Sequence, residues 1–211
     1  MGVMLLGSFF EAFQSHFFIV VVSVGLAAGT VIPLGVWARN RPIASTLILG
    51  FDNLISTVPS VALYGLLMPL LAIWNVGIGT VPAVVALFLY SQLPMLRNTL
   101  VGLRNIDPAV VDAAIGMGMT ERQILFRIRL PLAMPMIMSG LRTSAVMGTG
   151  VASIAAYIGA GGFGTYIIRG IAASDRHTIL IGAFGASAMA VGIDFLLGGV
   201  QKILEGRIGK K

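Results

Sequence analysis

The chain has 211 residues, of which 57% are hydrophobic and 10% are charged, and its formal net charge is +6. A soluble domain of this size would carry far more charge, so the composition favours an integral membrane protein in contact with the lipid bilayer. The basic residues lie mostly between and after apolar runs, where they set membrane orientation, so no nucleic-acid partner is expected. The absence of cysteine excludes disulfide and thiolate chemistry.

The N-terminal part contains one long apolar run, residues 17–38, which is long enough to cross a hydrocarbon core of about 30 Å. Residues 1–16 precede it and carry phenylalanines with Glu11 and His16 between them. Two structures fit this segment: an interfacial helix outside the membrane, or an extension of the first span.

The second apolar run, residues 43–73, is too long for one simple helix and contains Pro59 and Pro69. Two short helices broken near Pro59, or one kinked and tilted span, both fit. Asp52 and Asn53 lie within this run. Because polar and acidic groups inside a membrane are costly, they are candidates for the translocation pathway, with a structural role as the alternative.

Three further apolar runs, residues 81–96, 132–158 and 179–200, surround a charged insert and a glycine-rich segment. With five spans and the N-terminus outside, all basic residues except Arg169 and Arg176 face the cytoplasm. A hairpin in the second run would give six spans and weaken this asymmetry. The sequence therefore predicts an all-α polytopic protein with about five transmembrane helices, N-terminus out and C-terminus in.

Small residues recur every four positions in the last two spans, which predicts close helix packing without showing what the helices surround. They are Gly140, Ser144, Gly148, Ala152 and Ala156, and then Gly182, Ala186, Ala190 and Gly198. Asp194 interrupts the second stripe, and a structural role near water or a basic residue is favoured for it.

The charged insert reads as two short helices joined by a turn. Asp107-Pro108 is a good helix start, and Gly116 and Gly118 weaken or turn that helix. Thr120 to Gln123 matches a capping box, so a second helix begins there, and Leu130-Pro131 is expected to end or redirect it. The insert is longer than a plain connection requires. It carries an apolar row that predicts a partner: Ala113, Ala114, Ile115, Met117 and Met119.

The spacing within the insert resembles the EAA loop of ATP-binding cassette (ABC) importer permeases. Asp112-Ala113-Ala114 is followed after three residues by Gly118, and after nine more by Ile128, one residue and Leu130-Pro131. The departure is Asp112, where glutamate is usual. Residues 17–200 look like the transmembrane core of the methionine-permease-like fold, flanked by an extracytoplasmic interfacial segment, 1–16, and a basic cytoplasmic tail, 201–211.

Two stretches are similar to permeases for osmoprotectants such as glycine betaine, choline and carnitine: LRNIDPAVVDAAIGMGMTERQILFRIRLPLAMP and IGAGGFGTYIIRGI. Permeases for amino acids, of the methionine type, share parts of both, so such a solute stays the alternative. The resemblance implies a bacterial or archaeal cell membrane. It also implies cytoplasmic ABC ATPase subunits, a second permease subunit, identical or homologous, and an extracytoplasmic solute-binding protein.

The same resemblance implies roles for residues of the insert. The helix from Asp112 to Gly118 would be the coupling helix, with Ala113 and Ala114 allowing close approach to the ATPase. Asp112 or Glu121 would pair with a basic residue there. The full set expected at the coupling site is Asp112, Ala113, Ala114, Met117, Gly118, Met119, Thr120, Glu121, Ile128, Leu130 and Pro131. The permease itself would be non-catalytic and bind no cofactor, because ATP is used by the partner ATPase.

The segment from Gly159 to Gly164 fits G-x-G-x-x-G, but a dinucleotide site needs a preceding strand within a soluble βαβ unit. A turn or re-entrant segment is the better reading. Its glycines are candidates for an outer gate or a contact with the binding protein: Gly159, Gly161, Gly162 and Gly164.

Other functional classes find less support in the sequence. No convincing inverted repeat suggests a secondary transporter, although a self-contained channel or transporter stays an alternative. His16 and His177 have no acidic or cysteine partners at metal-ligand spacing, so no metal is expected. A membrane-embedded enzyme would need a catalytic cluster that the sequence does not suggest.

Overall fold

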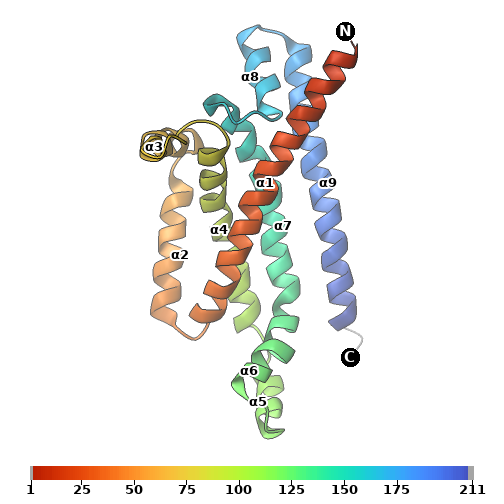
Figure 1. The fold of residues 1–211 in the computed structure, drawn as a ribbon. Coiled ribbons are helices and arrows are strands. Elements are labelled where there is room, and N and C mark those ends of the chain that lie inside the picture. Colours follow the sequence, from red (N-terminus) through yellow and green to blue (C-terminus); the bar gives the residue numbers. More distant parts are fainter. Residues whose placement is uncertain (1, 209–211) are drawn as a thin grey trace.

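The computed structural model describes residues 2–208, with side chains for 7–206, and this part of the chain is helical without strands (Figure 1). The α-helices are α1 (Gly2–Ala38), α2 (Pro42–Thr57), α3 (Ser60–Ala72), α4 (Thr80–Arg104), α5 (Pro108–Gly116), α6 (Glu121–Ile124), α7 (Leu130–Ile154), α8 (Gly164–Ala172) and α9 (Arg176–Ile208). A π-helical turn, η1 (Leu125–Arg129), precedes α7, and a 3₁₀ turn, η2 (Ala155–Ile158), follows it. The predicted all-α fold class is confirmed.

Five helices, α1, α2, α4, α7 and α9, run along the bundle axis in alternating directions (Figure 1). Four helices of the described chain are long and apolar enough to cross a membrane, and the bent pair α2–α3 brings the number to five if it is counted as one span. The short helix α8 lies at the end where α1 begins, whereas α5 and α6 project from the opposite end (Figure 1). The predicted count of about five spans is therefore confirmed.

The second apolar run is two helices, α2 and α3, that meet at an angle of 101°. Val58 and Pro59 have extended backbone between them, because proline disfavours helix at the preceding residue and supplies no N–H. This is the first of the two expected arrangements. With 16 residues, α2 is about 24 Å long, and α3 lies across the bundle axis rather than along it (Figure 1).

The described part of the predicted N-terminal segment, residues 2–16, does not form a separate element. It belongs to α1, which continues without a break through the first span to Ala38. Ala12 and His16 are buried, and Phe9 packs against Phe163 with ring centroids 5.1 Å apart. The segment is therefore a helical extension of the span, because it contains no helix breaker and its inner face is covered by the segment before α8.

The small-residue stripe of α7 faces the core as predicted. Gly140, Ser144, Gly148 and Ala152 are buried. A side-chain carbon at Gly140 would lie 3.0 Å from the Cα of Met95, so the glycine allows α4 and α7 to approach closely. The hydroxyl of Ser144 donates to the carbonyl of Ser91 on α4 over 2.8 Å. The bundle core therefore lies along the contact between α4 and α7.

Leu130-Pro131 does not end the second helix of the insert, contrary to the prediction. Residues 121–158 form one continuous helical segment through α6, η1 and α7. The amide N–H of Leu130 bonds to the carbonyl of Leu125, five residues earlier. Pro131 occupies the first turn of α7, and the π-helical turn before it lets the helix continue past a residue without an N–H.

Candidate functional site: the coupling surface and polar sites of the bundle

The turn in the insert is built on Gly118, which has a φ of +79°. Its N–H bonds to the carbonyl of Ile115 over 2.9 Å, and the N–H of Met119 bonds to the carbonyl of Ala114 over 3.1 Å. These two bonds define a Schellman motif, which needs a left-handed residue that glycine adopts without strain. The predicted turn is confirmed at Gly118, whereas Gly116 is the last residue of α5.

Both helix starts of the insert have the predicted caps. The carboxylate of Asp107 accepts from the N–H of Ala109 over 2.9 Å. Thr120 and Gln123 form the reciprocal capping box: each side chain bonds to the other residue's backbone N–H. The Asp107 cap stabilises the start of α5, a helix of nine residues that is too short to be stable alone, and the capping box stabilises the start of the long helical segment that begins at Glu121.

The apolar row of the insert divides into a buried and an exposed part. Val111, Ala114 and Ile124 form a small core, against which Met119 and Ile128 pack. Ala114 is fully buried and does not present a surface to a partner, contrary to the expectation for it. The helix period places Ala114 on the same face as Val111, three residues earlier, and both pack against Ile124, so Ala114 holds α5 against α6.

The exposed part is a compact edge that we call the coupling surface, defined as Asp112, Ala113, Ile115 and Met117. Ile115 is 54% exposed and Met117 is 74% exposed. Gly118 and Thr120 are also exposed beside it. Large apolar side chains exposed together at the tip of a projecting helix pair are typical of a protein-binding surface.

The remaining predicted coupling residues lie behind this edge. Glu121 is exposed, and its carboxylate is 4.0 Å from the guanidinium of Arg39, at the end of α1. Leu130 packs against a second small cluster that includes Leu103, and Pro131 is exposed. These residues support the insert or join it to the bundle. The structure therefore divides the predicted coupling residues into an exposed edge and residues that hold this edge in place.

Asp52 and Asn53 are adjacent on α2, so their side chains point in different directions and do not form one polar site. The side chain of Asp52 is 4% exposed, whereas Asn53 points outward and is exposed. The Oδ2 atom of Asp52 has no hydrogen-bond partner among the described residues. Both residues lie within α2, and neither is among the residues that contact the glycine segment, residues 159–164, in a printed hydrogen bond.

The glycine segment is a turn, as expected, and has no strand before it. Gly159, Gly161 and Gly162 have φ values near +80° (79°, 79° and 80°). Gly164 begins α8, where a side-chain carbon would lie 1.7 Å from the carbonyl oxygen of Ser153. The glycines are therefore required by backbone conformation and by close packing.

His16, which the sequence did not single out for this role, fastens the glycine segment to the bundle. Its Nδ1 accepts from the backbone N–H of Phe163 over 3.2 Å, and its Nε2 lies 3.0 Å from the carbonyl oxygen of Thr149. This pairing requires the neutral tautomer with the proton on Nε2. His16 is fully buried and joins α1, α7 and the glycine segment.

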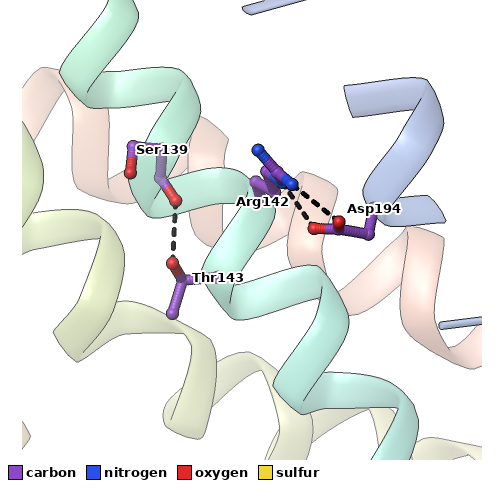
Figure 2. A network of polar contacts seen from close by, with 4 residues as sticks. All are labelled: Ser139, Arg142, Thr143 and Asp194. Atoms are coloured by element: carbon purple, nitrogen blue, oxygen red, sulfur yellow. Dashed lines mark hydrogen bonds and ion pairs between the residues drawn. The ribbon is translucent and has the colours of Figure 1, made fainter. Parts of the chain in front are cut away.

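A second polar contact is an ion pair between α7 and α9, which identifies the basic partner of Asp194 (Figure 2). The Nε and Nη2 atoms of Arg142 donate to the two carboxylate oxygens of Asp194 over 2.5 and 2.6 Å. Figure 2 shows the guanidinium reaching across from α7 to α9. Asp194 therefore has the basic partner expected for a structural role. Among the described residues, no group of three or more His, Cys, Asp or Glu side chains lies close enough to hold a metal ion.

Residues 31–210 match the family model described as "Binding-protein-dependent transport system inner membrane component". The osmoprotectant import permease protein OsmW of Salmonella typhimurium is 42% identical over 189 residues, covering 90% of this chain and 88% of that protein. The carnitine transport permease protein OpuCD of Listeria monocytogenes is 40% identical, covering 92% and 85%. The choline transport system permease protein OpuBB of Bacillus subtilis is 38% identical, covering 90% and 85%.

The structure also resembles solved membrane proteins. An inward-facing structure of the MetNI methionine ABC transporter contains a chain that matches with a TM-score of 0.84 and 19% identity, over 97% of this chain and 99% of that one. At this identity the likeness shows the shared fold, which is the fold expected from the EAA-like spacing.

Proposed function

Because this chain belongs to the family of binding-protein-dependent transport system inner membrane components, we propose that it is the permease subunit of an ATP-driven importer for quaternary ammonium osmoprotectants. The solute class is that of glycine betaine, carnitine and choline. The observation that carries this proposal is identity of about 40% across about nine-tenths of the chain with permeases of these solutes. The methionine transporter, at 19% identity, supports the fold and not the solute.

The proposal places the coupling surface in the cytoplasm. The end of the bundle that carries it also carries most of the basic residues, such as Arg39, Arg41 and Arg104, as expected for a cytoplasmic side. The N-terminus, α8 and the glycine segment then face outward, where a solute-binding protein delivers its cargo. A second permease subunit and two ATPases complete the importer, and this chain binds no ATP.

The structure suggests how an ATPase moves the spans. A partner groove that receives Ile115 and Met117 holds α5, which is joined to α6 through the small core around Ala114. Because α6, η1 and α7 form one continuous helical segment, displacement of the insert acts directly on α7. That helix packs against α1, α4 and α9, so its movement shifts the bundle between inward-facing and outward-facing arrangements.

Reconstitution tests this function. The complex of permease, ATPase and binding protein in liposomes is expected to take up glycine betaine or carnitine only with ATP. Gly118→Trp is expected to abolish uptake while leaving membrane insertion intact, because tryptophan is strained at a φ of +79° and stands beside the coupling surface. Gly118→Asn is the matched control, since asparagine tolerates left-handed backbone, and it is expected to retain most activity.

Two results would contradict the proposal. Uptake by the purified chain alone, without ATP or partners, would identify a self-contained transporter. Normal ATP-driven uptake by Gly118→Trp would show that the insert is not the coupling element.

A further inference from the structure

A cavity of about 390 Å³, open on the side where Thr57 and Met147 are exposed, lies at the break between α2 and α3, where these helices face α4 and α7. Its volume is in the range of small-molecule sites. Its polar lining consists of hydroxyl-bearing residues: Ser56, Thr57, Ser60, Tyr90, Ser91 and Ser144. No carboxylate, histidine or basic side chain lines it. Such a lining offers hydrogen bonds without a net charge, so it suits a solute that is itself neutral overall.

The cavity is flanked by two helix ends of opposite polarity. Ser56 and Thr57 belong to the C-terminal turn of α2, where unpaired carbonyl groups carry partial negative charge. Ser60 is the first residue of α3, a helix of 13 residues whose start has no side-chain cap. Free N–H groups there carry partial positive charge. The bend of 101° keeps the two helix dipoles from cancelling as they would in a continuous helix.

Tyr90 fixes this arrangement and supplies an aromatic wall. Its hydroxyl donates to the carbonyl of Val58, in the extended link between α2 and α3. Because that bond holds the phenol, its ring stays in place at the cavity. Aromatic rings attract quaternary ammonium groups, which have no N–H to donate and are recognised through their diffuse charge.

The buried hydroxyl of Ser91 is a second, independent observation that points to a ligand in this cavity. It is 2% exposed, and its Oγ has no hydrogen-bond partner among the described residues. Other hydroxyls of the cavity are already donating to backbone carbonyls: Ser56 to Asp52, Thr57 to Leu54, and Ser144 to Ser91. A buried hydroxyl in a membrane helix normally makes such a bond, but the Ser91 hydroxyl makes none with the described residues. Because Ser91 lines the cavity, rotation of its side chain would turn this donor toward a solute there.

We propose that this cavity is an intramembrane transit site for a zwitterion that carries a quaternary ammonium and a carboxylate. The ammonium end lies toward the Tyr90 ring and the C-terminus of α2. The carboxylate end accepts from Ser91 and from the N–H groups at the start of α3. The inference rests on the proposed function and adds a solute site within the permease itself.

Solute binding to the permease–ATPase complex without the binding protein tests the site. Radiolabelled glycine betaine is expected to bind saturably in equilibrium dialysis. Ser91→Ala is expected to weaken its binding about tenfold, near the low end for a lost hydrogen bond to a charged group. The matched control is Ser23→Ala, which removes another buried hydroxyl, bonded to the carbonyls of Ile19 on α1 and Val84 on α4, and is expected to leave binding unchanged.

Choline, a cation without a carboxylate, tests the orientation. It is expected to bind more weakly than glycine betaine and to be insensitive to Ser91→Ala. Equal sensitivity of both solutes would overturn the assignment of Ser91 to the carboxylate.

A variant that blocks the cavity tests the site even if the effect of Ser91→Ala on binding is small. Met147 lines the cavity and is 62% exposed, so Met147→Trp fills the opening without disturbing the core. It is expected to abolish both binding and uptake. Wild-type complex that imports glycine betaine but binds none without the binding protein would overturn the transit site and leave the proposed function intact. Wild-type complex that imports no quaternary ammonium solute would overturn the proposed function.

Discussion

His16→Leu tests the anchoring of the glycine segment. Leucine fills a similar volume in the fully buried position of His16 but makes no hydrogen bond. The N–H of Phe163 then stays buried without its partner, which costs about 1–3 kcal/mol. The carbonyl of Thr149 keeps a bond from the hydroxyl of Ser153 at 3.2 Å, so its loss is only about 1 kcal/mol. The expected decrease in the free energy of unfolding is therefore about 2–4 kcal/mol.

The assay is unfolding in mixed detergent micelles, followed by circular dichroism, together with limited proteolysis of the glycine segment. His16→Asn is the control, because the oxygen of asparagine stands near the position of the Nδ1 atom and accepts from Phe163. It is expected to recover about half of the lost stability. If His16→Leu unfolds like the wild type, the two bonds do not stabilise the segment. If the asparagine and leucine variants are equally unstable, the acceptor at Nδ1 is not the important group.

Three further predictions concern single contacts. Gly164→Ala is expected to destabilise the fold by about 3 kcal/mol in the same assay, because its side chain would lie 1.7 Å from the Ser153 carbonyl oxygen. Arg142→Gln and Asp194→Asn are each expected to lower ATP-driven uptake, and the double variant to recover part of it, because an unpaired charge between helices is worse than none. A hydrogen bond from Thr178 lowers the pKa of Asp175, which lies outside the spans. The ionised Asp175 carboxylate therefore stabilises the folded state fully above the ordinary carboxyl pKa, and this contribution is lost as the pH falls through the lowered pKa. The difference in the free energy of unfolding between wild type and Asp175→Asn should therefore narrow in acid.

For each of these three predictions, one result would contradict the reasoning behind it. Gly25→Ala, at an exposed helical glycine with no atom near the added carbon, is expected to be neutral, and equal loss at Gly164 and Gly25 would refute the packing argument. Additive losses in the Arg142 and Asp194 double variant would show that the two charges act independently. A stability difference for Asp175→Asn that does not change with pH would exclude the carboxylate as its source.

Local patterns in the sequence were sufficient for most of the fold. Apolar run lengths predicted the crossing segments, and the small-residue stripe of residues 140–152 predicted the buried face of α7. Asp107, Thr120 and Gly118 predicted the caps and the turn of the insert, because each acts on backbone groups within a few residues. The same kind of local rule predicted either a break or a kink near Pro59, and the structure has the break.

The errors lie where the outcome depended on packing. Leu130-Pro131 looked like a helix end, but a π-helical turn absorbs the missing N–H and the helix continues into α7. Ala114 looked like part of an exposed apolar edge. In the structure it is buried between α5 and α6, because only the relative placement of the two short helices decides which face is covered.

The sequence by itself determined the membrane class, the number of about five crossing segments and the position and turn of the charged insert, since hydropathy, capping and turn chemistry are local. The tertiary structure alone decided which residues meet across the chain. His16 is hydrogen-bonded to Phe163, 147 positions away, and Arg142 on α7 is paired with Asp194 on α9. The cavity at the α2–α3 break likewise needs α4 and α7 to close it. No local pattern encodes such pairs, because they form only when the helices of the bundle are packed together.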